Sequence, residues 1–196
     1  MANATITGNY AQSAGGVLRI GALSPTNHGS LNVTGLATFA PNASLYIGAI
    51  TGSTFANGST LSGLVNAGSL SATTFSVTSN SLLVNFTASV NGNSVNVAAA
   101  TSNSTSIPGA VAAQGNTAGA GAAGSLNTVF NSFVAGSSTY ASMNNAMAAF
   151  ANMSSNAQIS QAVSQSLPAL SSNSPLQTLG VLTAINQSIE ARSLKL

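Results

Sequence analysis

The first half of the chain alternates apolar and polar residues with a period of two, the pattern of strands that bury one face. Leu31 and Val33 alternate before the turn-forming pair Pro41-Asn42, and Leu45 and Ile47 alternate after it. Gly and Asn punctuate this half, and both accept left-handed backbone conformations at low steric cost. The pattern predicts short strands that stack beside one another in a parallel β-solenoid-like region.

A β-hairpin is predicted near the end of this half, in the segment LLVNFTASVNGNSVNVAA. Asn91-Gly92 favours a type I′ turn because both residues tolerate a positive φ. With this turn, Ala88 lies opposite Val95 and Phe86 lies opposite Val97, so that apolar side chains share one face. The hairpin therefore closes the strand region.

The second half of the chain has apolar spacings of three and four, which predict amphipathic helices. Gly115–Ser125 is rich in small residues and is expected to be a flexible or loosely helical connector, and Ser174-Pro175 is typical of a helix start. Helices this short are marginal alone and must pack on one another or on the strands. The four predicted apolar stripes are Leu126, Val129, Phe130, Phe133 and Val134; Tyr140, Met143, Met147 and Phe150; Ile159, Val163 and Leu167; and Leu176, Leu179, Leu182, Ile185 and Ile189.

Together these patterns predict an α+β chain in two parts. Residues 1–107 form the parallel β-solenoid-like strand region with its terminal hairpin, and residues 108–196 form the region of short α-helices. The side chains expected to build the structural core of the strand region are Tyr10, Leu18, Ile20, Leu31, Val33, Phe39, Leu45, Ile47, Phe86, Val95 and Val97.

Charge is almost absent from this chain. Charged residues make up 2% of the sequence, against about 25% in an ordinary domain, and no Lys, Arg, Asp or Glu occurs between Arg19 and Glu190. The solvent-facing surface must therefore consist of hydroxyl and amide groups, and charge repulsion cannot keep copies of the protein apart. Three basic residues cannot neutralise a run of phosphates, so nucleic acid is not expected as a partner.

The residue inventory excludes most enzyme mechanisms. There is no Asp, no Cys, one Glu and one His, so paired carboxylates, thiolate metal sites and a Ser-His-Asp triad cannot be assembled. His28 in the segment PTNHGS is expected in an exposed turn. The sequence predicts a non-enzymatic protein with no catalytic, metal or cofactor-binding residues and no cofactor.

Two phrases in the first half, GNYAQSAGGVLRIGAL and HGSLNVTGLATFAPNASLYI, resemble the C-terminal passenger region of bacterial autotransporters, which carry a G-x-Y-x-Q strand followed by an L-x-V-x-G-x-A strand. Three later phrases resemble the helical segment that some autotransporters place between passenger and outer-membrane barrel: IPGAVAAQGNTAGAGAAGSLNTVF, NAQISQAVSQSLPAL and TLGVLTAINQSIEARSLKL. The chain departs from many relatives in lacking Asp and Lys in its strands.

The resemblance implies a type V secretion protein at the bacterial cell surface or outer membrane, or secreted. Residues 8–107 are then expected to be the last part of a β-helical passenger with an autochaperone-like role, and residues 189–196 to approach the barrel. The implied partners are the upstream passenger and the cognate outer-membrane barrel of a longer parent chain. The function expected from it is support of passenger folding and secretion.

An adhesive or self-associating surface module is the alternative function. Uncharged strand faces rich in Ser, Thr and Asn offer hydrogen-bonding rows and strand edges without the charges that usually prevent edge-to-edge contact. This alternative predicts a homo-oligomer. Binding of ice or carbohydrate through hydroxyl rows is a weaker third hypothesis, because Thr follows no long regular repeat.

Overall fold

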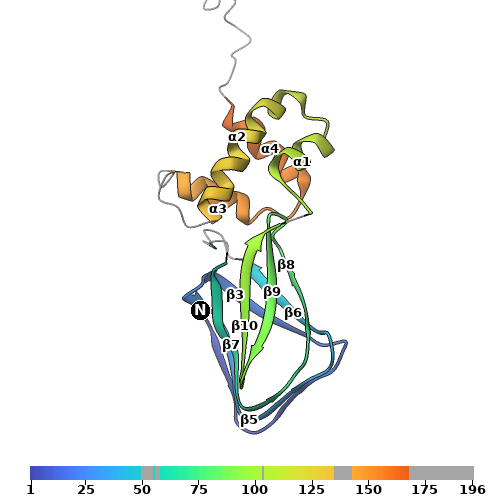
Figure 1. The fold of residues 1–196 in the computed structure, drawn as a ribbon, viewed down its shortest axis with the longest axis vertical. Coiled ribbons are helices and arrows are strands. Elements are labelled where there is room, and N and C mark those ends of the chain that lie inside the picture. Colours follow the sequence, from blue (N-terminus) through green and yellow to red (C-terminus); the bar gives the residue numbers. More distant parts are fainter. Residues whose placement is uncertain (50–54, 56–57, 103, 135–142, 168–196) are drawn as a thin grey trace, which may run out of the picture. The chain divides into compact units, whose positions relative to one another are not determined.

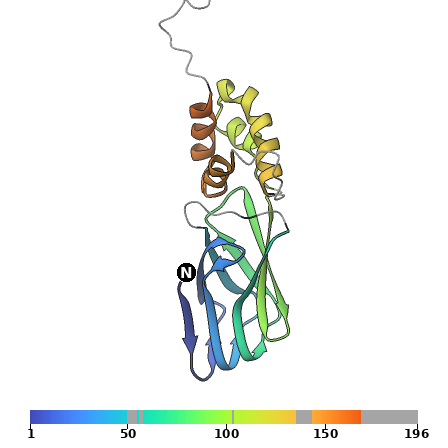
Figure 2. The ribbon, with the colours of Figure 1, turned by 90° about the vertical axis from the view of Figure 1, so that its left-hand side faces the viewer.

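The computed structural model describes residues 1–49, 55, 58–102, 104–134 and 143–167, in which ten strands precede four helices (Figures 1 and 2). The residues from Met1 to Ser166 form one compact unit. The strands are β1 (Asn3–Ile6), β2 (Tyr10–Gln12), β3 (Val17–Ser24), β4 (Asn27–His28), β5 (Ser30–Phe39), β6 (Ala43–Ala49), β7 (Thr60–Ser71), β8 (Phe75–Ser79), β9 (Val84–Asn91) and β10 (Ser94–Thr101). The helices are α1 (Ile107–Ala113), α2 (Thr117–Val134), α3 (Asn144–Ala151) and α4 (Asn156–Ser166).

The strands form two mixed sheets, so the expectation of a parallel β-solenoid-like region was wrong. Sheet A has the order β1-β5-β7-β10-β9, with β2 also paired to β5, and sheet B has the order β4-β3-β6-β8. Parallel pairs join β1, β2, β5 and β7 in sheet A and β3, β6 and β8 in sheet B, whereas β10 and β4 pair antiparallel. The antiparallel pairs arise where the chain reverses, between β3 and β4 and between β9 and β10, because a connection of two residues can join only antiparallel strands. The class is α+β, with strands first and helices after them.

The β9–β10 hairpin exists, but its predicted register and turn were wrong. Val97 lies opposite Ala88, and Val95 lies opposite Val90. The two turn residues are Gly92 and Asn93, and only Gly92 has a positive φ, of 58°. A glycine in the first of two turn positions is the requirement of a type II′ turn. Each partner therefore shifts by two positions, which keeps the apolar residues on the predicted face because side chains alternate with a period of two.

The buried apolar residues form two clusters. The strand cluster lies entirely within sheets A and B and consists of Leu31, Val33, Ala37, Phe39, Ala43, Val65 and Val95. The mixed cluster joins strands to helices, and Leu45, Ile47 and Leu64 share it with Phe130, Met147 and Ile159. The backbone N–H of Leu82 also donates to the carbonyl of Met153 at 2.9 Å. The strand region and the helical region thus share the mixed cluster as a common core.

Helix α2 begins earlier than its apolar stripe, which starts at Leu126, predicts. Helix α2 includes most of the Gly115–Ser125 run, so the run belongs to a regular helix and is not a flexible connector. Asn116 supplies its N-cap, because the Asn116 Oδ1 accepts from the backbone N–H of Gly119 at 2.9 Å. The side chains of Phe130, Met147, Phe150, Ile159 and Val163 are buried, as the stripes predict. Tyr140 and the fourth predicted helix lie outside the described residues.

Candidate functional site

The described residues hold no cluster of three or more His, Cys, Asp or Glu side chains that could bind a metal ion. The expectation that His28 lies in an exposed turn was wrong: it lies in β4 and is half-buried, and its Nδ1 is 3.0 Å from the carbonyl oxygen of Gly29. No helix in the described part of the chain has the length and apolar character to cross a bilayer. The candidate site therefore lies on the strand edges and faces, which carry unpaired backbone groups and exposed side chains.

Most of the predicted core side chains are buried in the two clusters. Tyr10 and Leu18 are half-buried and pack against the clusters from their edge. Both lie on strands at the same edge of the fold, β2 and β3. The fully buried members of the predicted set are Ile20, Leu31, Val33, Phe39, Leu45, Ile47, Phe86, Val95 and Val97.

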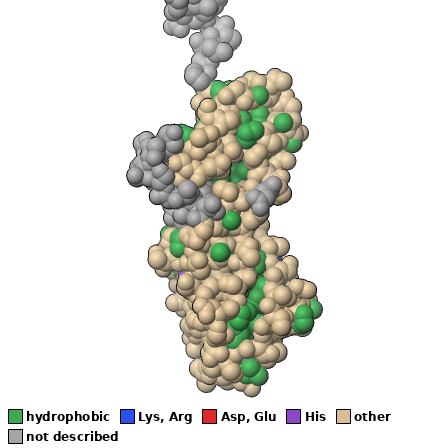
Figure 3. All heavy atoms as spheres, in the orientation of Figure 1, with side chains coloured by type: hydrophobic (Ala, Val, Ile, Leu, Met, Phe, Trp, Pro, Cys, Tyr) green, Lys and Arg blue, Asp and Glu red, His purple; other side chains and the backbone are tan. Residues whose placement is uncertain are grey.

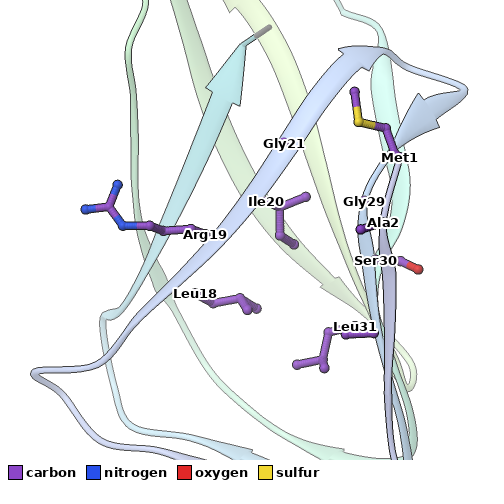
Figure 4. Close-up of a pocket in the computed structure, with 10 residues that line it drawn as sticks. Met1, Ala2, Leu18, Arg19, Ile20, Gly21, Gly29, Ser30 and Leu31 are labelled. Carbon is purple, nitrogen blue, oxygen red and sulfur yellow. The ribbon is translucent and has the colours of Figure 1, made fainter.

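The space between sheets A and B is open on the side of β1, β2 and β3, which we call the open end. β1 and β2 pair only with β5, and β3 pairs with β6 and, near its last residues, with the short β4, among the described strands. A cavity of about 360 Å³ lies there between β1, β5 and β3. Leu18, Ile20 and Leu31 point into this space (Figure 4). The open end is therefore an apolar opening between two strand edges.

The charged side chain of β3, Arg19, is turned away from the open end. Arg19 lies between Leu18 and Ile20 in β3 and points to the opposite face (Figure 4). Its guanidinium carbon lies 4.6 Å from the ring centroid of Tyr46, its direct neighbour in the β3–β6 register. A cation over an aromatic face is stabilised by the negative face of the ring. Arg19 and Ser30 border the cavity, but Leu18, Ile20 and Leu31 are the side chains that point into it.

The opposite end of the strand region is closed. There β8 is the last strand of sheet B and β9 is the last strand of sheet A, and these two strands contact each other. Four residues, 80–83, connect them. Phe75 and Val77 of β8 pack against the mixed cluster that contains Phe86 of β9. Side chains therefore fill the interior here, in contrast to the open end.

Successive parallel strands are also joined at a corner where the backbones approach closely. The backbone N–H of Gly35 in β5 donates to the carbonyl of Gly8 at 2.9 Å, and a Cβ on Gly35 would lie 2.7 Å from that oxygen. The Oδ1 of Asn9 accepts from the N–H of Leu36 at 2.8 Å, and the Thr34 hydroxyl accepts from the N–H of Gly8 at 2.9 Å. Only glycine fits at position 35, because any side chain would collide with the preceding corner.

Gln12 is a buried amide that links three parts of the strand region. Its side chain is 6% exposed, and its Nε2 donates to the carbonyls of Gly16 and Ser44, each at 2.9 Å. Its Oε1 accepts from the Tyr10 hydroxyl at 3.1 Å, and burial raises the pKa of that Tyr10 hydroxyl. The Tyr10 ring packs on Phe39 with centroids 5.6 Å apart. The Tyr and Gln of the G-x-Y-x-Q phrase thus tie the first strands to β6.

A row of neutral polar side chains crosses the outer face of sheet A. Thr5, Asn32, Asn66, Ser94 and Asn91 are successive partners across β1, β5, β7, β10 and β9. Asn66 is fixed at its centre, since its Nδ2 donates to the Asn32 Oδ1 at 3.2 Å and its Oδ1 accepts from the Ser94 hydroxyl at 2.9 Å. We call this set the amide row. The face of the protein in Figure 3 is likewise dominated by neutral polar side chains and backbone.

Sequence reasoning missed Gln12 and the open end. The G-x-Y-x-Q phrase marks Gln12, but its partner Ser44 lies on another strand, so the phrase carries no sign that the amide is buried. The open end depends on which strands lie at the sheet edges, and the apolar alternation is the same for edge and inner strands. Comparisons of this chain with protein-family models, curated proteins and solved structures found no match.

Proposed function

We propose that this chain is a non-enzymatic end module of an autotransporter passenger, which supports passenger folding and secretion at the bacterial cell surface. The single observation that carries the proposal is the contrast between the two ends of the strand region. One end is closed by β8 and β9, and the other presents strand edges, unpaired among the described strands, beside an apolar cavity. Such a fold terminates a β structure on one side and accepts further strands on the other.

Strand addition at the open end is favourable for a chain that emerges unfolded. A preceding strand would meet the ordered edges of β1 and β3, so its backbone N–H and C=O groups would find partners at once. Its apolar side chains would gain about 25 cal/mol per Å² of area removed from water. Folding energy could then be released outside the membrane without ATP.

The near absence of charge fits passage through a narrow pore. Moving an unpaired charged side chain from water into a less polar environment costs on the order of several kcal/mol for each ion. Residues 20–189 contain no Lys, Arg, Asp or Glu, so this cost does not arise over most of the chain. The proposed partners are an upstream passenger at the open end and a cognate outer-membrane barrel that follows the helical region.

The test is delivery of a reporter passenger. A β-stacked reporter without its own end module is joined to this chain and to an outer-membrane barrel, and surface exposure is measured by protease digestion of intact cells. We expect the chain to raise delivery of folded reporter, and Val33→Asp, at a position 3% exposed, to abolish that gain. Thr87→Asp, on the exposed face of β9, is the matched control and should deliver normally. Equal delivery without the chain, or with Val33→Asp, would overturn the proposal.

The amide row favours a second candidate function, an adhesive surface module. Amide and hydroxyl groups both donate and accept hydrogen bonds, as do the hydroxyls of a neutral glycan, and the hydrogen bonds of Asn66 hold the row in place before binding. The test is binding of the purified chain to immobilised neutral polysaccharide. Asn32→Ala and Thr5→Ala should weaken binding, whereas Thr78→Ala on sheet B should not. Binding that all three variants retain would remove this candidate.

A further inference from the structure

The open end is also suited to contact with a second copy of this chain. One of the exposed large apolar side chains among the described residues, Met1, is 46% exposed and lines the cavity at this end. We propose that two copies pair head to head through their open ends whenever no preceding strand occupies them. This inference uses the same edge as the proposed function but does not depend on a role in secretion.

A two-fold rotation axis perpendicular to both sheets satisfies the geometry. Such an axis keeps sheet A beside sheet A of the second copy and sheet B beside sheet B, and it reverses the direction of every strand. β1 then pairs antiparallel with β1, and the unpaired part of β3 pairs antiparallel with β3. Both pairings are isologous, so one contact closes the assembly as a dimer and leaves no open end for a third copy.

Backbone pairing of the strand edges supplies most of the attraction between the two copies, because Ile20 and Leu31 are already only 6% and 5% exposed in a single copy. Burial of the exposed Met1 and Ala4 and of the half-buried Leu18 adds to it. The cavities of about 360 Å³ face each other across the axis, and Leu18, Ile20 and Leu31 of one copy lie opposite the equivalent side chains of the other (Figure 4). Ala4 lines the cavity mouth and is exposed, whereas its column neighbour in β5 is the larger Leu31. The small side chain at position 4 leaves room for an incoming apolar group.

Electrostatics offers little opposition to this contact. Natural strand edges usually carry charges that prevent edge-to-edge pairing, but β1 has the sequence NATI and the cavity contains no acidic group. Arg19 stays on the outer face over Tyr46. The Arg19 side chains of the two copies are exposed to solvent, so salt screens the repulsion between them, with a screening length of about 10 Å at 0.1 M salt. We therefore expect association to strengthen as ionic strength rises.

The dimer should be weak and reversible, because its contact consists of two short strand edges and one apolar opening. Stable protein interfaces bury about 1,600 Å² in total, and smaller contacts are typical of transient association. Sedimentation velocity of the full chain over a range of concentrations is the primary measurement. A mass that rises from monomer toward dimer and stops there supports the inference. A concentration-independent monomer, or growth beyond the dimer, would overturn it.

Charge variants at the open end locate the contact. Ala4→Lys and Ala4→Glu each place two like charges near the axis and should weaken association at least tenfold, whereas an equimolar mixture of the two should associate again. Val90→Lys is the matched control, since Val90 is 39% exposed on β9 at the closed end and should leave association unchanged. Circular dichroism establishes that each variant is folded. If Val90→Lys lost association while both Ala4 variants kept it, the assignment of the contact to the open end would be wrong. The delivery assay would still test the proposed function independently.

Discussion

The strand region and the helical region are held together differently, although charge contributes little to either. The strand region has one charged side chain, Arg19, and the described residues of the helical region have none. In the strand region, amide side chains bridge neighbouring strands, as Gln12 does to Ser44 and Asn80 does to the backbone of Ala49. In the helical region, most polar side chains bond within their own helix or its cap, and Asn116 is an exception that reaches Ser160 of α4. The comparison indicates that stacked strands depend on amide bridges, whereas the helices depend on apolar packing.

The largest expected effect concerns the core that both regions share. Leu45→Ala in β6 and Ile159→Ala in α4 each remove a side chain at most 1% exposed from the mixed cluster, and each should lower the free energy of unfolding by about 2–5 kcal/mol. Both variants should shift one common transition, followed by circular dichroism for the helices and by tyrosine fluorescence for the strands. The measurement uses a Tyr140→Phe background, so that Tyr10 and Tyr46 are the fluorescent tyrosines. If Ile159→Ala melts the helices while the strand signal stays unchanged, the two regions do not share a core.

The next effect tests the amide bridges directly. Gln12→Ala removes two donated hydrogen bonds in a buried position and should cost about 2–3 kcal/mol, measured by urea unfolding. Gln12→Glu keeps the shape of the side chain but turns a carboxylate toward two carbonyl oxygens at pH 7. Because burial and the missing donor favour the protonated acid, this variant should regain stability as the pH falls toward 4. A Gln12→Glu variant as stable as the wild type at pH 7 would contradict the bridging role.

A smaller effect is expected from the corresponding polar residue of the helical region. Asn116→Ala removes the N-cap of α2 and the contacts of the Asn116 Nδ2 with the hydroxyls of Ser160 and Ser164, at 2.9 and 2.8 Å. The expected loss is about 1–2 kcal/mol. Asn116→Asp restores the cap but not the donated bonds, so its stability should lie between those of the wild type and Asn116→Ala. An Asn116→Ala loss equal to that of Gln12→Ala would remove the distinction between the two regions.

The smallest effect is a pH dependence at the edge of the strand region. Burial raises the pKa of Tyr10 in the folded protein above its unfolded value of about 10. The neutral hydroxyl therefore contributes stability that is present below pH ~10 and is lost as the pH rises through the folded pKa. Tyr10→Phe should make unfolding less sensitive to pH in this alkaline range, at a cost of about 1 kcal/mol at pH 7 for the lost hydrogen bond to Gln12. If the stability of the variant depended on alkaline pH as strongly as that of the wild type, the pH dependence would arise from groups other than Tyr10.

Local patterns predicted the class of each region, because apolar periodicity follows directly from which face is buried. Leu31, Val33, Leu45 and Ile47 are buried for this reason. The position of β10 between β7 and β9 could not be read from such a pattern, since alternation is the same for parallel and antiparallel partners. The hairpin register depended on which of two adjacent residues took the first turn position, and Gly92 took it.

The features of the candidate site and of the helices that the sequence did not predict depend on long-range contacts. The Gly115–Ser125 run has weak intrinsic helix propensity, yet it is helical because Asn116 caps it and α2 packs against α1 and α4. The buried state of Gln12 depends on Ser44, which lies on a different strand. The cavity at the open end lies where β1 and part of β3 have no neighbouring strand among the described residues. Each of these features requires knowledge of which segments meet in space.

The reversal of the chain at Gly92 and Asn93 gives the whole strand region a direction. With β10 running antiparallel between β7 and β9, the parallel series of sheet A ends at β7. Parallel strands encoded before β1 could therefore extend sheet A only at the edge of β1. The number of added strands would depend on the length of chain that precedes β1. Under the proposed function, the strands near the helical region would fold first, and each strand encoded before them would then add to an edge that is already ordered.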